Sequence, residues 1–284
     1  METFDLLLKI QSSKAMNTRV QAEAIVLNHL VPWFSKNCPT LDKFQTSYEE
    51  IWSSYVAFSK AQNPKKPRML GHDRRYLVMA LRRARKKEWI TKDFTKNDFP
   101  LMEFSEPIGK HIPDEPMQKI LNYLNERSDK AYLQVLMAYT MGMRISEILH
   151  LKKEEIDFEN REINLDPKRL KTRRARKVPI PITNAVLPLL KERHEAARGE
   201  YLFPSVIGGK EILDKPQRDN AYWWKKARKH AGFKCRFHDL RHTCLSNALA
   251  GGMPPLTASK IFGCTQAVLE RVYDHIRLKD RELH

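Results

Sequence analysis

Apolar residues recur at helical spacing through most of the first hundred positions of the chain. In residues 22–34 they repeat at intervals of three and four until Pro32 disturbs the pattern, which predicts an amphipathic helix. A second helix is predicted over residues 46–62, where Ser47 and Glu50 have the three-residue spacing of a capping box. A third is predicted over residues 73–90, with basic residues outside its apolar face. These patterns predict a compact helical domain over residues 1–99.

The helical pattern stops between Thr95 and Pro113, in a stretch that contains three prolines and has no steady period. We therefore expect a linker between domains at residues 100–112. A new helix is predicted to begin at Asp114, a good N-cap residue that opens the second domain, residues 113–284.

The second domain mixes helical and strand periods. Residues 132–151 are apolar at helical spacing, whereas residues 156–165 alternate and residues 176–181 are typical of a strand. We expect a hairpin whose turn spans residues 168–175. Further helices are predicted at residues 184–197, 221–232, 237–252 and 255–263. The predicted fold is mainly α, with a helical N-terminal domain and a mixed α/β second domain that contains a small antiparallel sheet.

The composition is strongly basic. The 284 residues include 51 Lys and Arg against 34 Asp and Glu, which gives a formal net charge of +17. Such an excess favours a polyanionic partner, most commonly nucleic acid. No apolar run is long enough for a membrane span, and the N-terminal residues have no secretory pattern, so we expect a cytoplasmic, nucleoid-associated protein with no membrane partner. Four cysteines in a chain of this length are expected to stay reduced.

The positive charge is concentrated in two segments. Residues 60–92 contain twelve Lys and Arg against two acidic residues, and seven of the twelve residues at 166–177 are basic. A solvated helix face usually interleaves the two signs, so phosphate contact explains these segments better than solubilising charge does. The residues predicted to bind DNA are Lys65, Lys66, Arg68, Arg74, Arg75, Arg82, Arg83, Lys168, Arg173 and Arg174.

The second domain also contains an ordered set of residues suited to phosphodiester chemistry. Cleavage without water or metal needs a nucleophile, cations that hold the phosphate oxygens, and an acid that protonates the departing oxygen. Arginine suits the second task because its planar fork matches two phosphate oxygens. The set comprises, in chain order, Arg144 after a glycine with Glu147 one helical turn on, Lys171 in the basic turn, His238 and Arg241 at i and i+3, Cys264 after Gly263, and Tyr273.

This ordered set resembles the tyrosine recombinase family, also called phage-type integrases, and the resemblance covers nearly the whole chain. It rests on G-x-R-x-x-E at residues 142–147, the hairpin lysine, H-D-L-R-H-T at residues 238–243 and the downstream tyrosine. Each motif alone is weak, but their order is specific. The resemblance implies that residues 1–99 form a core-binding domain and that residues 113–284 form the catalytic domain.

The resemblance also implies a role for each residue. Arg144 and Arg241 correspond to the two arginines that hold the phosphate, and Lys171 to the general acid toward the 5′ oxygen. His238 assists as a base or phosphate donor, and Tyr273 is the nucleophile that leaves a 3′-phosphotyrosine and a free 5′-hydroxyl. Family members exchange strands through a Holliday junction as homotetramers on two DNA duplexes at a specific recombination site. They need no metal, cofactor or ATP.

One position departs from the family pattern. Where the family usually has His, or sometimes Trp, before the tyrosine, this chain has Cys264. A thiol is a weak hydrogen-bond donor, so phosphate stabilisation there should be poorer. We expect Cys264 to be a weakened member of the catalytic set. Glu147 and His242 are expected to support it, Glu147 by orienting Arg144 or capping its helix.

Other interpretations of single residues remain open. Tyr273 alone would more often be a packing residue, and only the upstream set favours a nucleophile. Lys171 has rivals in its own turn, Lys168, Arg169, Arg173 and Arg174, and is preferred for its distance from Val178 and Pro179. The cluster Cys235, His238, His242 and Cys244 invites a zinc site, but its spacing matches no closed zinc pattern, so no metal is expected.

Two alternative functions also remain open. A type IB topoisomerase uses a similar Arg, Lys, Arg, His and Tyr set, although the helical N-terminal domain and the two motifs argue against it. A DNA-binding regulator weakened at Cys264 is the non-enzymatic alternative. The retention of Tyr273, Lys171 and both arginines argues against that alternative.

Overall fold

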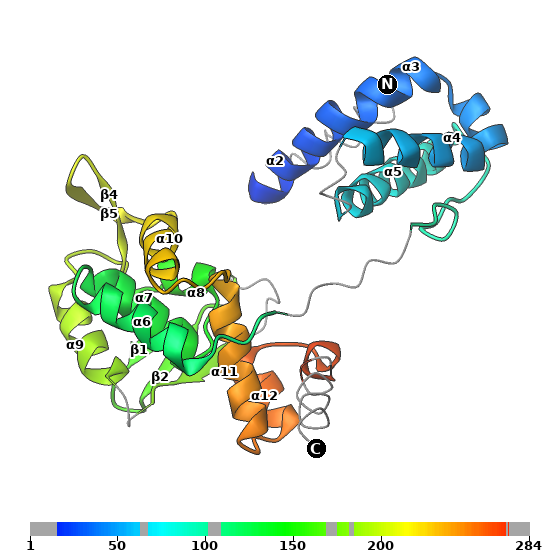
Figure 1. The fold of residues 1–284 in the computed structure, drawn as a ribbon. Coiled ribbons are helices and arrows are strands. Elements are labelled where there is room, and N and C mark those ends of the chain that lie inside the picture. The colour runs from blue at the N-terminus through cyan, green and yellow to red at the C-terminus, as the bar shows by residue number, and fades with distance from the viewer. Residues whose placement is uncertain are drawn as a thin grey trace. The chain divides into compact units, whose positions relative to one another are not determined.

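The computed structural model describes residues 16–62, 68–101, 109–168, 175–181, 185–270 and 272. The chain divides into two compact units, Met1–Glu106 and Pro107–His284 (Figure 1). The division falls inside the segment that the sequence predicts as a linker. Each unit has a hydrophobic core of its own.

The described part of the N-terminal unit is helical. Its elements are α2 (Met16–Ile25), the π-helix η1 (Val26–Leu30), α3 (Val31–Asn37), α4 (Leu41–Gln62) and α5 (Arg68–Lys86). Aromatic rings fill much of the core and pack edge to face, as Trp33 does against Tyr55 and Trp52 against Phe99. Asp73 is the buried acid among them, and it accepts hydrogen bonds from Tyr55 Oη at 2.8 Å and pairs with His29 Nδ1 at 3.1 Å. These partners offset the cost of burying a carboxyl group whose pKa is raised by that burial.

Two helix boundaries in this unit differ from the sequence prediction. The first predicted helix, residues 22–34, is longer in the structure, where α2, a π-helical turn and α3 follow one another from Met16 to Asn37. A proline has no N–H to donate, and it is tolerated here at the first turn of α3. The second helix begins at Leu41 rather than near Ser47, and Ser47 is instead a kink inside α4, with φ −132° and ψ 29°. The predicted capping residue therefore lies at an interruption of the helix rather than at its start.

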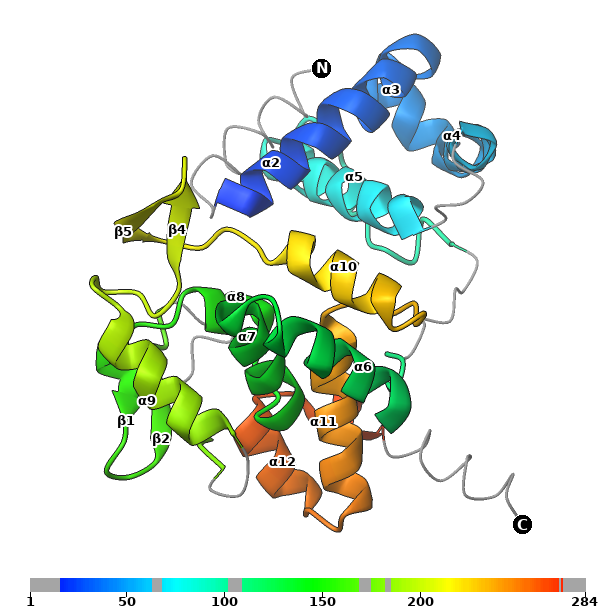
Figure 2. The same cartoon turned by 60° about the vertical axis from the view of Figure 1, so that its left-hand side comes forward.

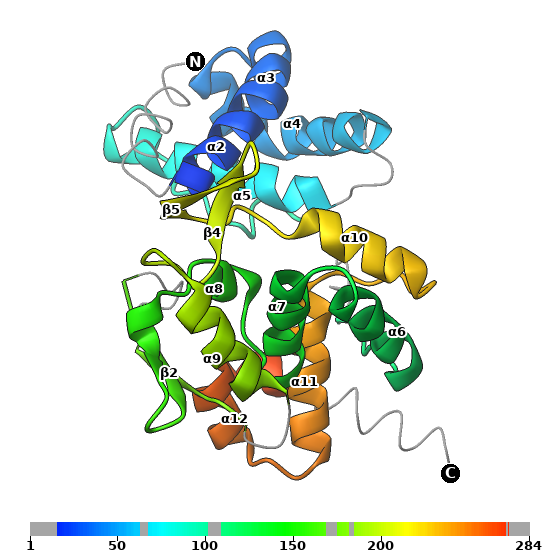
Figure 3. The same ribbon diagram turned by 90° about the vertical axis from the view of Figure 1, so that its left-hand side faces the viewer.

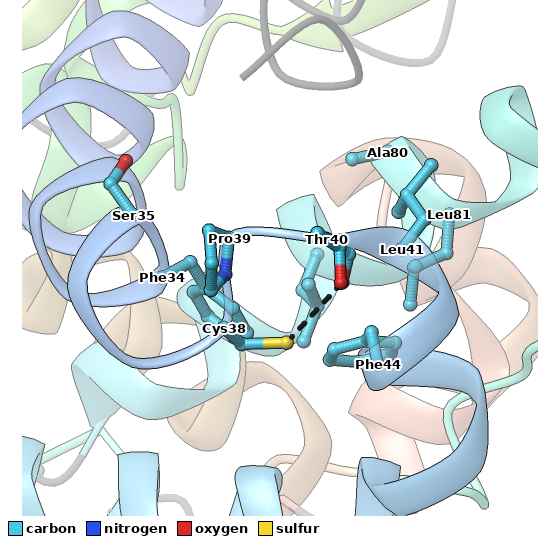
Figure 4. A pocket seen from close by; sticks show the side chains of 10 residues that line it. Phe34, Ser35, Cys38, Pro39, Thr40, Leu41, Phe44, Ala80 and Leu81 are labelled. Carbon is cyan, nitrogen blue, oxygen red and sulfur yellow. Dashed lines mark hydrogen bonds between the residues drawn. The ribbon is translucent and has the colours of Figure 1, made fainter.

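A pocket lies between the end of α3 and helices α4 and α5 (Figure 4). Apolar side chains from Phe34, Phe44 and Leu81 line it, and Cys38 Sγ donates a hydrogen bond to the carbonyl oxygen of Thr40 at 3.5 Å. None of the residues predicted to perform chemistry lines this pocket. It is a packing feature of the N-terminal unit.

The C-terminal unit mixes helices with short strands (Figure 2). Its helices are α6 (Asp114–Asn125), α7 (Asp129–Thr140), α8 (Ile145–Leu149), the 3-10 helix η2 (Lys153–Glu155), α9 (Val186–Ala196), α10 (Ala221–His230), α11 (His238–Ala250) and α12 (Pro255–Phe262). Its strands are β1 (Ile156–Asp157), β2 (Glu162–Leu165), β3 (Arg176–Pro179), β4 (Pro204–Ile207) and β5 (Lys210–Pro216). Apolar helix α7 packs against α6, α9 and α11, and α11 in turn contacts α12 (Figures 2 and 3).

The predicted hairpin is present. Strands β2 and β3 pair antiparallel, with Ile163 opposite Val178, and β1 pairs with the other edge of β2. The middle of the turn, residues 169–174, lies outside the described residues. A second hairpin, β4 with β5, projects from the unit and is absent from the sequence prediction (Figure 3). Its signal was the pair Gly208-Gly209, both with positive φ, between two stretches with strand-forming residues.

The predicted helix over residues 132–151 is divided in two. Helix α7 ends at Thr140 and α8 begins at Ile145, and Gly142 between them has a φ of +60°. A left-handed residue ends an α-helix, so the backbone turns sharply just before Arg144. The predicted fold class, mainly α with a small antiparallel sheet in the second domain, is confirmed.

Candidate active site

The break after α7 positions Arg144 at the start of α8. Its backbone is extended, and its N–H donates to Glu147 Oε2 at 2.8 Å. The guanidinium donates through Nη1 to Glu147 Oε1 at 2.8 Å and through Nη2 to the carbonyl oxygen of Gly263 at 2.6 Å. The Arg144 side chain is 28% exposed, whereas the Glu147 side chain is 5% exposed. Glu147 thus fixes both the backbone and the side chain of Arg144 and leaves the guanidinium accessible.

Arg241 approaches the same place from α11. Its Nη1 donates to the carbonyl oxygen of Gly142 at 2.5 Å, and its Nη2 donates to that of Phe262. Burial, followed by the positive charges of Arg144 and Arg176, lowers the pKa of Arg241 to about 10. The guanidinium therefore stays protonated at neutral pH. Arg241 and Arg144, the clamp arginines that are predicted to hold the phosphate, thus donate to the adjacent carbonyl oxygens of Phe262 and Gly263.

A third arginine, Arg176, belongs to this group and was not among the residues selected from the sequence. It lies on β3, is buried, and pairs through Nη2 with Glu147 Oε2 at 2.5 Å. Its Nη1 donates to the carbonyl oxygen of Phe262 at 2.5 Å. Strand alternation was the signal that could have found it, because Arg176 shares a face with buried Val178.

His238 is exposed on the first turn of α11. Partial loss of hydration, and then the positive charges of Arg241 and Arg144, lower the pKa of its imidazole, so the ring favours the neutral form at pH 7. The next residue, Asp239, is buried and accepts hydrogen bonds from Arg236 N at 2.7 Å and Lys110 N at 3.3 Å. Asp239 therefore ties the start of α11 to the chain that enters the unit.

Cys264 follows Gly263, which ends α12 in the left-handed conformation with a φ of +57°. The thiol is half-buried, and the backbone carbonyl oxygen of Cys264 accepts a hydrogen bond from Ser259 Oγ at 2.8 Å. Burial raises the pKa of the thiol, although the charges of Arg241, Arg144 and Arg176 act in the opposite direction. Cys264 is accordingly a neutral thiol beside the arginine group.

The remaining predicted residues divide into described and undescribed ones. Half-buried His242 lies on the face of α11 that packs against Gly109. Its Nδ1 is 3.4 Å from Ser246 Oγ. Lys171 and Tyr273 lie outside the described residues, so their predicted roles stay predictions. Among the described residues, the fold brings Arg144, Glu147, Arg241 and Cys264 together, with His238 close enough to sense the arginine charges.

The residues predicted to bind DNA are also only partly described. Lys65, Lys66, Arg173 and Arg174 lie outside the described residues, as does the side chain of Arg68. Arg75 and Arg82 are exposed on α5, whereas half-buried Arg74 donates to the carbonyl oxygen of Phe99 at 3.2 Å. Arg83 is half-buried on the same helix, and Lys168 is exposed after β2. Their binding roles stay predictions.

In the described part of the chain, no group of three His, Cys, Asp or Glu residues could hold a metal ion. A search of the same ranges for a helix long and apolar enough to cross a membrane finds none.

The sequence model of the phage integrase family matches residues 110–279. This match covers more than half of the chain, and the chain belongs to that family. The expected resemblance is confirmed.

Individual relatives are distant. The integrase of Salmonella phage P22 is 26% identical over 206 residues, which cover 70% of this chain and 52% of that protein. The tyrosine recombinase XerC-like protein of Caldanaerobacter subterraneus is 27% identical over 204 residues, covering 59% of this chain and 51% of the relative. The tyrosine recombinase XerA of Thermococcus onnurineus is 27% identical over 206 residues, which cover 72% of this chain and 70% of that protein. The chain spans about half the length of the first two of these relatives.

Solved structures share the fold. The integrase of transposon Tn1549, in complex with transposon right end DNA, superposes with a TM-score of 0.71 at 18% identity and covers 99% of this chain and 98% of that one. A lambda integrase tetramer bound to a Holliday junction gives a TM-score of 0.70 at 16% identity, with 95% of this chain and 76% of that one covered.

Proposed function

We propose that this chain is a site-specific DNA recombinase that cleaves and rejoins strands through a 3′-phosphotyrosine at Tyr273. The hydroxyl oxygen of Tyr273 attacks the phosphorus and loses its proton to His238 as the base, the bond from phosphorus to the 5′ oxygen breaks, and Lys171 gives the proton that this oxygen needs. A 5′-hydroxyl from another duplex then attacks the phosphotyrosine and releases the enzyme. The number of phosphate ester bonds is conserved, so the reaction needs no ATP, and the arginines would stabilise the phosphate charge in place of a metal.

The observation that carries this proposal is the charge imbalance around Glu147. Arg144, Arg176 and Arg241 bring three guanidinium charges to one place, and among the described side chains that contact one another there, Glu147 is the acid. Arg144 and Arg176 share the single Glu147 carboxylate, so the group keeps two unbalanced positive charges, and the printed acceptors of the Arg241 guanidinium are carbonyl oxygens alone. A scissile phosphate supplies the missing negative charge, and its oxygens can replace carbonyl oxygens as acceptors.

The other residues complete the proposed reaction. Arg144 and Arg241 would hold the phosphate oxygens, and neutral His238 would accept or share a proton at the phosphate. Cys264 occupies the position of a further donor, where its thiol would contribute little. The basic residues predicted to bind DNA, on α5 and in the turn between β2 and β3, would contact the DNA backbone.

The assembly is part of the proposal. A lambda integrase that shares this fold is a tetramer bound to a Holliday junction. Two relatives that are named tyrosine recombinases are each 27% identical to this chain in sequence. We propose that four copies of this chain act on two DNA duplexes at a specific site. Such a protein would work at the nucleoid, in the cytoplasm.

Replacing Tyr273 with Phe tests the proposal. Duplexes that become covalently attached to the wild-type protein would be recovered from a randomised library after denaturation in SDS, with EDTA present and ATP absent. The Tyr273→Phe variant should form no adduct on these duplexes, while its Kd changes by less than about threefold because phosphate contacts supply most of the affinity. Tyr222→Phe, at an exposed tyrosine of α10, is the control that should keep the adduct. An adduct on the Tyr273→Phe protein, or none on the wild type, would refute the assignment.

A further inference from the structure

Arg176 is a buried cation on a short strand. Along β3, Arg176 and Val178 face the interior whereas Lys177 and Pro179 are exposed. The Arg176 side chain is 4% exposed, and burial lowers the pKa of its guanidinium. Removing an arginine from water is costly, and replacing a buried ion pair with apolar residues is often neutral or stabilising. Its presence here therefore calls for a role other than stability.

The contacts of Arg176 connect three separate parts of the unit. It extends from β3, the strand that follows the basic turn, and its Nη2 lies 2.5 Å from Glu147 Oε2 on α8. Its Nη1 donates to the carbonyl oxygen of Phe262 at the end of α12. Its side chain also packs against Gly263, where an added Cβ would lie 2.9 Å from Arg176 Cδ.

Each of these contacts is shared with a predicted clamp arginine. Glu147 Oε2 accepts from Arg176 and from the backbone N–H of Arg144, while Oε1 accepts from the Arg144 guanidinium. The carbonyl oxygen of Phe262 accepts from both Arg176 and Arg241. Arg176 thus shares one acceptor with each clamp arginine. A shift of its guanidinium would move Glu147 and the turn before Cys264 together.

We propose that Arg176 is a positioning residue for strand cleavage, which holds Arg144 through Glu147 and aligns the end of α12 with Arg241. Arg176 is too deeply buried to bind DNA from the surface, so it acts on the orientation of the other two arginines. This inference rests on the proposed recombinase function. It predicts that cleavage is sensitive to Arg176 and that DNA affinity is not.

The test uses full-length protein and the duplexes that wild-type protein attaches to covalently. At saturating protein, the rate constant for adduct formation should fall about 10²-fold in Arg176→Met, because small misplacements of catalytic groups have effects of this size. The Kd for the same duplexes should change by less than about threefold, because the exposed basic residues that contact phosphate are unaltered. Arg176→Lys retains the charge but can reach one acceptor at a time, so its rate constant should lie between those of the wild type and Arg176→Met.

Arg193 on α9 provides a matched control. It is a half-buried arginine of the same unit, with a carbonyl acceptor (Leu202, 2.8 Å from Nε) and a carboxylate (Glu211, 3.7 Å from Nη2), and neither partner belongs to the candidate site. Arg193→Met should lower the Tm and leave the rate constant for adduct formation unchanged. A loss of rate in Arg193→Met equal to that in Arg176→Met would assign Arg176 a general structural role and overturn the inference.

A double substitution separates positioning from independent effects. If Arg176 acts through Glu147, the rate constant for adduct formation of the Arg176→Met, Glu147→Gln double variant should lie within about threefold of that of the slower single variant. The reason is that the effects of coupled residues are not additive in free energy. Multiplied losses would overturn the inference, as would wild-type rates in both Arg176 variants. If Arg176→Met does not fold, the Lys variant decides by the same criterion. Failure of the wild type to form any adduct would instead remove the proposed function, and this inference with it.

Discussion

The side chain of Cys264 is surrounded by positive charge and yet stays uncharged. Three arginines lie near enough to affect its titration, but burial raises the pKa of the thiol, so the protonated form is favoured at neutral pH. A thiolate would compete with a phosphate for the arginines, whereas a neutral thiol does not. Cys264 is therefore compatible with an anion at this place, although it offers that anion little beyond a weak S–H donor.

Replacing Cys264 with His should preserve or raise the rate of strand cleavage. An imidazole N–H is a much better donor to a phosphate oxygen than a thiol is, and one donor at such a site changes rates by about 10²-fold in sensitive cases. Single-turnover adduct formation on the recovered duplexes measures the change. Cys264→Ala is the control and should stay within about threefold of the wild type, because a weak donor is all that it removes.

A sharp loss of cleavage in Cys264→His, or in Cys264→Ala, would show that the thiol has a role of its own.

Single residues also show where sequence reasoning stops. Arg144, Arg241 and Cys264 were selected from short motifs in the right order, and the fold brings them together. Arg176 was not selected because a run with seven basic residues in twelve resembles a surface that faces DNA. Its two-residue spacing from buried Val178 places its side chain on the inner face of β3, a strand signal that the basic composition of the run concealed.

At the level of helices and strands, periodicity predicted most elements, and backbone chemistry modified their ends. Residues 132–151 were predicted as helical with Arg144 just after a glycine, and Gly142 divides the segment into α7 and α8. Ser47 gave a capping pattern and instead kinks α4. The spacing of apolar residues reports which face of a helix is buried, so it does not give the backbone angles at a single residue such as Gly142 or Ser47. The β4–β5 hairpin was missed because its strands are largely exposed and lack a clear apolar alternation.

Gly142 is the backbone position on which the clamp depends most directly. Its φ of +60° is unfavourable for any residue with a Cβ, and an added Cβ would lie 2.4 Å from the Phe262 ring. Gly142→Ala should therefore lower the unfolding free energy by at least about 1 kcal/mol. It should also slow cleavage, because the Gly142 carbonyl oxygen accepts from Arg241. Denaturant unfolding and single-turnover adduct formation measure the two effects.

Gly71 in helix α5 is the matched control for this substitution. An added Cβ there meets no atom within 4 Å, so Gly71→Ala should raise stability by about 1 kcal/mol through helix propensity. A Gly142→Ala protein as stable and as fast as the wild type would contradict the proposed role of this turn.

For the whole chain, the dominant property is its excess of positive charge. A net charge of +17 includes many lysines and arginines that the candidate site does not use. On α5, the guanidinium of half-buried Arg74 already donates to the carbonyl oxygen of Phe99 at 3.2 Å, and that of exposed Arg82 donates to the carbonyl oxygen of Phe94 at 3.4 Å. Net charge alone therefore overstates the number of cations that a DNA backbone could meet.

Arg75→Ala should weaken DNA binding equally for specific and unrelated duplexes. Each phosphate contact that is lost reduces the slope of log K against log salt concentration by about one, because fewer counterions are released. Titrations of labelled DNA at several salt concentrations measure this slope. Lys119→Ala is the control, since Lys119 is paired with Glu115 at 2.6 Å on the exposed face of α6 and should leave the slope unchanged. An unchanged slope in Arg75→Ala would remove this residue from the DNA-binding surface, and a loss confined to one DNA sequence would mean that Arg75 reads bases instead of phosphates.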